Sequence, residues 1–335
     1  MDKFKVGIIG CGGIHKVHAE ILNKLENTEL VAVCDIVPDR AAASAKAYGV
    51  PSYCTDYMDI INDPKIQSVH LCVPHYLHAP MAIAAMQAGK AVLTEKPLAT
   101  SLSDAERILA VQKKTGAHTG VCFQNRYRRL VQKLNSMIEN GELGEIYGGR
   151  AFINWCRNEE YFTASGWRGS WKTEGGSLLI NQCIHTLDLL QWMLGGVKQV
   201  NGMIGHHFFG NVIETEDTAE LRLTMNSGID MLFYATTGYC EDSFVLIDIV
   251  AEKAHVRLED DLYVTWNNGA KETFEENHAT GEKAYWGNTH INLISDFYDK
   301  LQKGEPFNIS VEEGLKTIRI LDAAYTNPNI NKTRW

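Results

Sequence analysis

VGIIGCGGIH, residues 6–15, is an apolar run that ends at a glycine-rich turn and leads into a helical pattern over residues 16–25. A second apolar run, residues 30–34, is followed by Asp35. This order predicts a strand, a turn, a helix and a second strand with an acid at its end. Glycines let the backbone approach a pyrophosphate, and the helix N-terminus supplies N–H groups and the positive end of a dipole. The stretch therefore predicts a dinucleotide-binding Rossmann fold.

The identity of the dinucleotide depends on Asp35. It lies about 20 residues beyond the turn, where a carboxylate accepts hydrogen bonds from a ribose 2′-OH and repels a 2′-phosphate. We therefore expect NAD rather than NADP, although Arg40 could still tolerate a phosphate. His15 replaces the usual third Gly or Ala, which puts tight helix–strand packing there in doubt, and a purely structural glycine loop is the alternative. The residues expected to hold the cofactor in this region are Gly10, Cys11, Gly12, Gly13, Ile14, Asp35 and Arg40.

Length and composition indicate a globular protein of two domains. The chain has 335 residues, of which 45% are hydrophobic and 22% charged. The net charge of -9 argues against a nucleic-acid partner. No apolar run is long enough to span a bilayer, and no signal-peptide pattern opens the sequence. The 8 cysteines form no C-x-x-C pair, so we expect reduced thiols in a cytoplasmic protein.

Strand and helix patterns alternate over residues 1–122, which predicts a doubly wound parallel sheet with helices on both faces. Ser103 is the expected N-cap of a helix that ends at Gly116. The other expected helices cover 39–48 and 79–88, and the later expected strands cover 69–73, 91–95 and 118–123.

Residues 123–335 carry consecutive strand patterns with short turns, which predict an open, mainly antiparallel sheet with helices on one face. We expect this second domain to bind the substrate and to form the oligomer. Its last helix could pack back on the first domain. The expected strands are 146–155, 200–209, 219–225, 229–237, 244–250, 255–258 and 262–266, and the expected helices are 178–194, 288–303 and 311–325.

Glu95-Lys96-Pro97 is the first group that could carry chemistry. It follows a predicted parallel strand, at the carboxyl edge where open α/β sheets bind their ligands. A lysine at this edge can reach both a bound cofactor and a substrate hydroxyl. The alternative is an ordinary surface lysine before a helix.

The second group lies on the helix expected over 178–194. Asn181, His185 and Asp188 fall at i, i+4 and i+7 and would form one polar stripe. A histidine on such a stripe can act as a neutral base whose neighbours set its orientation. The alternative is a core histidine that is satisfied by Asp188.

The whole chain resembles the Gfo/Idh/MocA oxidoreductases, which include glucose–fructose oxidoreductase, inositol dehydrogenase and rhizopine-catabolism proteins. The matching pieces are residues 10–14, Cys34-Asp35, Val73-Pro74 with His78, Gly89-Lys90, Glu95-Lys96-Pro97, residues 123–127, the glycine-led helix with His185 and Asp188, and Gly314 with Ala323-Ala324-Tyr325.

The resemblance implies roles for individual residues. Lys96 would hydrogen-bond the reacting hydroxyl and orient the nicotinamide, and a cis peptide would precede Pro97. His185 would take the hydroxyl proton as hydride leaves the same carbon for nicotinamide C4. The resemblance also assigns further residues to the cofactor site, namely Pro74, His78, Glu95, Lys96 and Gln124.

Asn181 departs from the inositol dehydrogenase branch, which often has Asp at this position. An amide cannot accept a proton, although it can hold a hydroxyl by hydrogen bonds. The branch that oxidises the 3-hydroxyl of nucleotide-linked or glycosidic hexoses sometimes carries Asn. We therefore favour a hexose 3-hydroxyl as the reacting group.

Aromatic and basic residues cluster before the proposed catalytic helix and could line a sugar pocket. Aromatic faces stack on sugar C–H surfaces, and Arg or Lys binds hydroxyls or a carboxylate; the alternative is a packed loop rich in tryptophan. No cluster has metal-ligand spacing, so we expect no metal. Besides Lys96, Asn181 and His185, the candidates for substrate binding are Trp155, Trp167, Arg168, Trp171 and Lys172, with Arg126, Asn154, Tyr285 and His290 as weaker ones.

Together these patterns predict NAD-dependent oxidation of a secondary hydroxyl on a sugar, glycoside, nucleotide sugar or inositol. Because an open sheet needs its exposed face covered, we expect a homodimer or homotetramer. One alternative is oxidation that triggers elimination on a glycoside, with NAD retained and recycled. The other is a non-catalytic dinucleotide or sugar sensor, which the presence of both Lys96 and His185 disfavours.

Overall fold

The computed structural model describes residues 3–276, 289–327 and 330–333. They form two compact units. The first consists of Met1–Gln124 and His290–Ile318, and the second of Asn125–Thr289 and Arg319–Trp335. The predicted boundary at 122/123 lies beside the first division. Residues 290–318 belong to the first unit, although the sequence predicts 290–310 in the second domain and leaves only the last helix free to pack on the first.

The first unit contains a six-stranded sheet of order β3-β2-β1-β4-β5-β6. All its strand pairs are parallel. Strands β4 and β5 are buried along their whole length, as is usual where helices cover both faces of a sheet. The doubly wound prediction is confirmed. The strands are β1 Phe4–Ile9, β2 Thr28–Cys34, β3 Ser52–Cys54, β4 Ser68–Leu71, β5 Ala91–Thr94 and β6 Thr119–Val121, and the intervening helices are α1 His15–Lys24, α2 Pro38–Tyr48, α3 Tyr57–Asn62, α4 His75–Gln87 and α5 Leu102–Thr115.

The start of α5 corrects one prediction. The N-cap is Ser101, not Ser103, because the Ser101 hydroxyl accepts a hydrogen bond from the Asp104 backbone N–H at 3.1 Å. Ser101 also donates to the Asp104 carboxylate at 3.0 Å. Gly116 ends the helix in the left-handed conformation, as predicted.

The second unit contains a nine-stranded sheet of order β14-β13-β12-β11-β7-β10-β9-β8-β15. The β7–β10 and β8–β15 pairs are parallel, and the other pairs are antiparallel. The prediction of a mainly antiparallel sheet is therefore confirmed. The strands are β7 Ile146–Asn154, β8 Val197–Gly205, β9 Thr218–Met225, β10 Asp230–Thr236, β11 Leu246–Ala251, β12 Ala254–Leu258, β13 Leu262–Trp266, β14 Lys271–Phe274 and β15 Asn331–Thr333.

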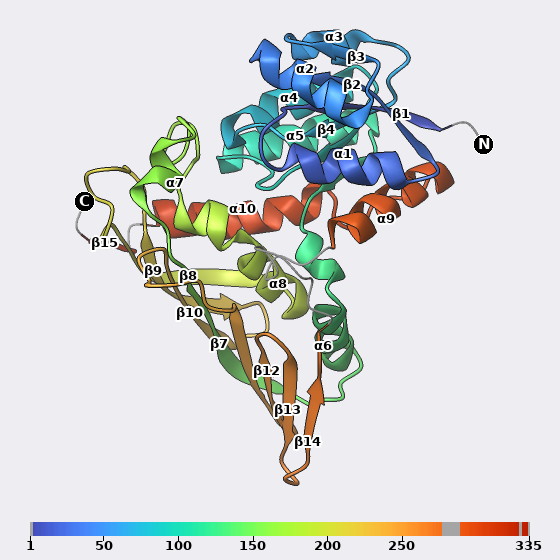
Figure 1. Cartoon of the computed structure of the whole chain (residues 1–335). Helices are drawn as coiled ribbons and strands as arrows, with labels where there is room; N and C mark the ends of the chain where they lie inside the picture. Colours follow the sequence, from blue (N-terminus) through green and yellow to red (C-terminus); the bar gives the residue numbers. More distant parts are fainter. Residues whose placement is uncertain (1–2, 277–288, 328–329, 334–335) are drawn as a thin grey trace. The chain divides into compact units, whose positions relative to one another are not determined.

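The two faces of this sheet differ in polarity and burial. One row of paired residues across four strands, Leu221, Phe233, Ala151 and Ile247, is buried. The helices α6 Arg129–Glu139 and α8 Ile184–Met193 belong to the same unit (Figure 1). On the opposite face Leu232 is 53% exposed and Val250 48% exposed. The single-face burial explains the alternating pattern of the strands.

The helix predicted over 178–194 is interrupted. Leu178–Gln182 forms a π-helical turn that contacts β9 and β10, and α8 begins at Ile184. Asn181 and His185 therefore lie on different helical segments, and the prediction of one continuous polar stripe is wrong. Apolar spacing could not reveal this, since the π-helical turn and the α-helix bury the same kinds of side chain.

The last two helices are α9 His290–Lys303 and α10 Val311–Thr326. Gly314, in the part of α10 that belongs to the first unit, lies against Leu98 and Val121. Among the described residues, no helix combines the length and the apolar character needed to cross a membrane. All eight cysteines are described, and none forms a disulfide.

Candidate active site

The glycine turn after β1 provides an open backbone cradle. Gly10 has φ +96°, and a Cβ there would lie 2.4 Å from the Cys72 carbonyl oxygen, so only glycine fits. At Gly12 and Gly13 a Cβ would meet no described atom within 4 Å. No described side chain caps the N-terminus of α1, which begins directly after this turn. Space and unsatisfied N–H groups together fit a pyrophosphate.

His15 links the turn to the neighbouring helix. Its Nδ1 contacts the Gly12 carbonyl, and its Nε2 lies 3.1 Å from the Ser44 hydroxyl on α2. Burial lowers the pKa of the imidazole, which favours the neutral ring. A polar contact therefore takes the place of the close glycine packing that is usual at this position.

Asp35 clamps the end of β2 to the turn. One carboxylate oxygen accepts a hydrogen bond from the Cys11 backbone N–H and the other from the Val37 N–H, each at 2.9 Å. Each oxygen has a second lone pair with which it can accept a ribose hydroxyl. Arg40 is exposed on α2.

Lys96 follows β5, and the Lys96–Pro97 peptide is cis, as the resemblance implied. The Lys96 backbone N–H donates to the Glu95 carboxylate at 3.3 Å. Glu95 also accepts from His18 on α1 at 3.0 Å, and lies 3.5 Å from His290 on α9. Burial would raise the pKa of Glu95, but the hydrogen bond from His18 and the nearby His290 outweigh it and hold this pKa well below its usual range. A buried carboxylate thus anchors the backbone of the candidate lysine.

This buried network continues away from Glu95. His18 Nδ1 lies 2.8 Å from His70 Nδ1, and His70 Nε2 lies 2.9 Å from the Tyr298 hydroxyl. Burial holds the pKa of His70 well below its usual range. The nitrogen and oxygen atoms of His18, Glu95 and His290 that could bind a metal ion all lie within 4.8 Å of one another. No sequence pattern reveals this grouping, because the three residues come from distant segments. His290, one of the weaker sugar-pocket candidates, thus belongs to the first unit.

His78 and Gln124 complete the candidate cofactor residues of the first unit, beside Pro74 at the start of α4. The His78 ring is buried between the Pro97 carbonyl, at 2.6 Å, and the Val73 carbonyl, at 2.9 Å. It therefore holds the cis turn that carries Lys96. The Gln124 Oε1 atom is buried and has no hydrogen-bond partner among the described residues. It is an acceptor that a cofactor could satisfy.

In the second unit, Glu216 holds the π-helical turn. Its carboxylate accepts hydrogen bonds from the N–H groups of Ser177 at 3.2 Å and Leu179 at 2.9 Å, and from the Tyr325 hydroxyl at 2.8 Å. Burial raises the pKa of Glu216. Gly176 has φ +138°, and a Cβ there would lie 2.2 Å from the Tyr325 hydroxyl oxygen, so a larger residue would disturb this contact.

Asn181 lies on this turn among polar partners. Its amide donates to Glu174 Oε1 at 2.6 Å, and its nitrogen lies 3.5 Å from the Tyr161 hydroxyl. Gln182 donates to the same hydroxyl at 2.5 Å. Asn181 is thus held by an acid that the sequence analysis did not consider.

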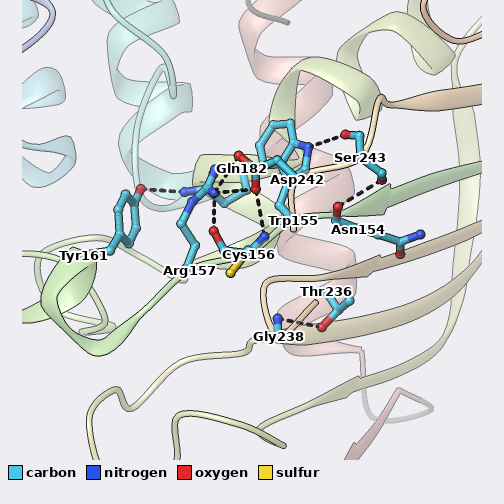
Figure 2. A network of polar contacts seen from close by, with 10 residues as sticks. All are labelled: Asn154, Trp155, Cys156, Arg157, Tyr161, Gln182, Thr236, Gly238, Asp242 and Ser243. Carbon is cyan, nitrogen blue, oxygen red and sulfur yellow. Dashed lines mark hydrogen bonds and ion pairs between the residues drawn. The ribbon is translucent and has the colours of Figure 1, made fainter. Parts of the chain in front are cut away.

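Arg157 is the centre of the adjoining network (Figure 2). Its guanidinium donates to Gln182 Oε1 at 3.0 Å and to Asp242 at 2.9 Å. It lies 5.1 Å from the ring centre of Trp155 and 5.3 Å from that of Tyr161. Tyr161 also stacks with a second guanidinium at 4.5 Å, that of Arg168, which lies 4.9 Å from the Trp167 ring. Cationic and aromatic groups, which suit sugar binding, are therefore brought together here.

The remaining predicted substrate residues lie in varied settings of the second unit. Arg126 makes a buried two-point ion pair with Asp188, at 2.8 and 2.6 Å, and its guanidinium lies 5.1 Å from the Trp192 ring. Asn154 has a buried Oδ1 with no hydrogen-bond partner among the described residues. Lys172 is exposed. The Trp171 indole donates to the Glu214 carbonyl, and Tyr285 lies outside the described residues.

His185 is the second residue of α8 and is half-buried. Lys96 belongs to the first unit and His185 to the second. Their joint action on one alcohol stays a prediction.

Sequence reasoning missed the polar side chains that hold these residues. Glu174 directly precedes Gly175-Gly176, and Gln182 directly follows Asn181, so both stood beside a motif that was already noted. Arg157 and Glu216 carry no comparable signal, because only the fold brings their segments to the turn.

Comparisons with known proteins agree along nearly the whole chain. A family model described as an oxidoreductase family with an NAD-binding Rossmann fold matches residues 4–123. A second, described as the C-terminal alpha/beta domain of an oxidoreductase family, matches residues 135–332.

Individual relatives are similar at modest identity. Inositol 2-dehydrogenase of Salmonella paratyphi B is 27% identical over 312 residues, covering 90% of this chain and 87% of the relative. D-glucoside 3-dehydrogenase of Escherichia coli is 28% identical over 346 residues, covering 96% and 94%. The structure of the WlbA dehydrogenase from Bordetella pertussis, in complex with NADH and UDP-GlcNAcA, has a TM-score of 0.84 and 28% identity and covers 96% of this chain and 95% of that one. Levoglucosan dehydrogenase in complex with NADH has a TM-score of 0.87 at 21% identity, which shows the shared fold.

Proposed function

The chain belongs to the Gfo/Idh/MocA oxidoreductase family, and we propose that it oxidises a secondary hydroxyl of a hexose ring, at the 3-position, with NAD as hydride acceptor. The substrate class is a sugar, a glycoside or a nucleotide sugar. Inositol is the second choice. Lys96 and His185 act on the reacting hydroxyl.

The observation that carries this proposal is the shared strand edge of the first unit. The glycine turn, Asp35, Pro74 and Lys96 follow β1, β2, β4 and β5, which are parallel, so all of them lie at the carboxyl edge of one sheet. The glycine turn follows β1 and Lys96 follows β5, and only β4 lies between these two strands, so the two sites are about 10 Å apart. A dinucleotide with its pyrophosphate on the turn and its nicotinamide toward Lys96 fits this arrangement.

The chemistry divides between two side chains. NAD⁺, held by the glycine turn and Asp35, would supply the acceptor for the hydride of the carbinol carbon. Lys96, anchored through Glu95 and the turn at Pro97, hydrogen-bonds the hydroxyl oxygen and stabilises the charge that develops on it. His185 takes the hydroxyl proton, so the alcohol loses a hydride and a proton and becomes a ketone. Asn181 binds a hydroxyl of the ring and takes no proton.

Several observations support the choice of a hexose derivative and of its 3-hydroxyl. Asn181 stands where the inositol branch of the resemblance often has Asp. One relative is a D-glucoside 3-dehydrogenase, and a structural neighbour is complexed with a nucleotide sugar acid. The cationic and aromatic groups around Tyr161 suit a ring that carries a carboxylate or a glycosidic substituent.

The direct test is NADH formation by the purified protein with a panel of inositols, aldoses, glycosides and nucleotide sugars. We expect turnover of hexose derivatives to exceed that of inositols, with a 3-keto product by NMR. Faster turnover of an inositol contradicts the substrate assignment. Elimination on a glycoside, with tightly retained cofactor and no net NADH, indicates the alternative in which oxidation triggers elimination. Dinucleotide binding without turnover indicates a sensor.

We further propose that a second copy of the chain covers the exposed face of the nine-stranded sheet. Leu232 and Val250 are about half exposed at its centre, beside the ion pairs Arg150–Asp248 and Arg222–Asp230, and exposed apolar side chains on an open sheet face favour a partner. Light scattering should give a dimer or tetramer that Leu232→Glu converts to smaller species. Tyr53→Glu, at an exposed site of the other sheet, is the control. A monomeric wild type contradicts this assembly.

A further inference from the structure

Glu174 is a buried acid to which the proposed mechanism assigns no role. It is 0% exposed and precedes the Gly175-Gly176 turn. One carboxylate oxygen accepts the Gly169 backbone N–H at 2.6 Å, and the other accepts the Asn181 amide at 2.6 Å. Burial of a carboxylate is costly unless it is hydrogen-bonded, and here both oxygens are. The Asn181 contact therefore belongs to the network that supports this charge.

The chemistry of this contact fixes one end of Asn181. An ionised carboxylate only accepts hydrogen bonds, so the NH₂ group of the amide must face Glu174. The Asn181 carbonyl oxygen then points to the other side of the amide group. A protonated Glu174 can instead donate, and the carbonyl end of Asn181 could then turn toward it. The ionisation of one residue thus controls which hydrogen-bonding atom the other presents.

Several charged groups face Glu174. Burial raises the pKa of Glu174 to about 7, although the Gly169 N–H, the Asn181 amide and the nearby Arg168 lower it. Glu216, a second buried acid, adds to the rise. Tyr161 and Tyr325 also feel the Glu174 charge, and in both the phenol has a raised pKa and stays neutral. Glu174 is therefore placed to change its protonation near neutral pH.

We propose that Glu174 is a positioning residue that, as a carboxylate, holds the Asn181 amide with its carbonyl oxygen turned away from Glu174 as an acceptor for a substrate hydroxyl, and that protonation of Glu174 releases this orientation. The proposal rests on the proposed function, in which Asn181 binds the sugar ring. It makes sugar binding weaker on the acid side of neutrality without any change at Lys96 or His185.

The pairing also accounts for the amide at position 181. Aspartate there would place a second carboxylate at the 2.6 Å contact with Glu174. Two carboxyl groups at this distance cannot both be ionised, so one of them would have to keep a proton. Asparagine avoids this repulsion and supplies the donor that Glu174 needs.

The first test needs no substrate. The side-chain amide signals of protein labelled with ¹⁵N-asparagine are followed by NMR from about pH 5.5 to 8.5, a range that brackets an acid of this kind. The Asn181 signal is identified by its loss in Asn181→Ala. We expect it to titrate with a midpoint of about 7 in the wild type. The titration should vanish in Glu174→Gln and persist in Glu160→Gln, an exposed control acid. A wild-type Asn181 signal that does not titrate overturns the proposal, even if Glu174→Gln fails to fold.

The second test is kinetic and uses the best sugar from the panel. Loss of a hydrogen bond that depends on a charged group should raise KM about tenfold in Glu174→Gln. The kcat value should change far less, and the rise of the wild-type KM at low pH should be lost. Glu174→Asp should restore part of the wild-type KM. An unchanged KM in Glu174→Gln contradicts the role in substrate binding. If the NMR titration is present but no sugar or polyol is turned over, the proposed function fails while the control of Asn181 by Glu174 stands.

Discussion

Arg126 and Asp188 form a buried ion pair in which two guanidinium nitrogens donate to the two carboxylate oxygens, Nε at 2.8 Å and Nη2 at 2.6 Å. Asp188 lies three residues after His185 on α8, and the alternative interpretation gave it to that histidine. In the structure Arg126 donates to both of its oxygens. Asp188 thereby fixes α8, the helix that carries the proposed base.

Removing Arg126 should destabilise the second unit strongly. Arg126→Ala leaves the Asp188 charge buried without its partner, which costs about 3–5 kcal/mol of unfolding free energy. Urea unfolding followed by circular dichroism measures this loss, with Arg107→Ala as an exposed control. A loss below about 1 kcal/mol, the range of surface pairs, contradicts the importance of the pair.

Glu95→Gln should weaken the first unit in a way that depends on pH. The hydrogen bond from His18 and the nearby His290 hold the pKa of Glu95 below its usual value of 4.5, so the folded protein gains stability from this acid above that pH. The gain disappears as pH falls below 4.5 through the folded pKa. At neutral pH we expect Glu95→Gln to lower the unfolding free energy by about 3 kcal/mol.

Thermal or urea unfolding at several pH values tests this expectation, with Glu106→Gln as an exposed control on α5. The difference in unfolding free energy between the wild type and Glu95→Gln should narrow on acidification. A gap that stays constant down to the acid transition shows that Glu95 is not held as a carboxylate.

Glu174→Gln should show the opposite dependence on pH. Burial raises the pKa of Glu174 to about 7, so the folded state keeps a proton that the unfolded chain loses above pH 4.5. The stability contribution of Glu174 therefore falls as pH rises from 4.5 to about 7. The stability of Glu174→Gln relative to wild type should rise over this window, by up to about 3 kcal/mol. A flat or falling difference in unfolding free energy between pH 5 and 8 contradicts the raised pKa.

Asp35→Ala should weaken the preference for NAD over NADP. The substitution removes a carboxylate that would bind a ribose 2′-OH and repel a 2′-phosphate. The dissociation constant of NADPH divided by that of NADH should therefore fall about tenfold. Binding of NADH and NADPH by fluorescence titration measures this ratio. Asp39→Ala, an exposed acid in the first turn of α2, should leave it unchanged. An unaltered ratio in Asp35→Ala removes Asp35 from cofactor selection.

The parts of the fold that follow from local patterns were predictable. The order of β1, glycine turn, α1 and β2 is written in adjacent residues, and the cis peptide before Pro97 followed from the resemblance. The interruption of the helix at Cys183 was not predictable, because the apolar spacing of residues 178–194 fits an unbroken helix equally well.

Contacts between side chains that are distant in the sequence could not be predicted from it either. His18, Glu95 and His290 stand far apart along the chain, and only the packing of α1 and α9 beside the end of β5 brings them together. Glu174 stood next to a noted glycine pair, yet its role depends on burial and on Arg168 and Glu216, which no local pattern reveals. Periodicity predicts which residues are buried, but not which buried acid meets which donor.

The central claim is that Lys96 and His185 carry the hydride-transfer reaction. The most direct measurement is kcat/KM for NADH formation by the wild type, Lys96→Ala and His185→Ala on the best sugar of the panel, with NADH affinity measured in parallel. We predict that each substitution lowers kcat/KM by about 10²–10⁴-fold while His185→Ala keeps the wild-type affinity for NADH. Turnover at the wild-type rate in either variant would contradict the mechanism.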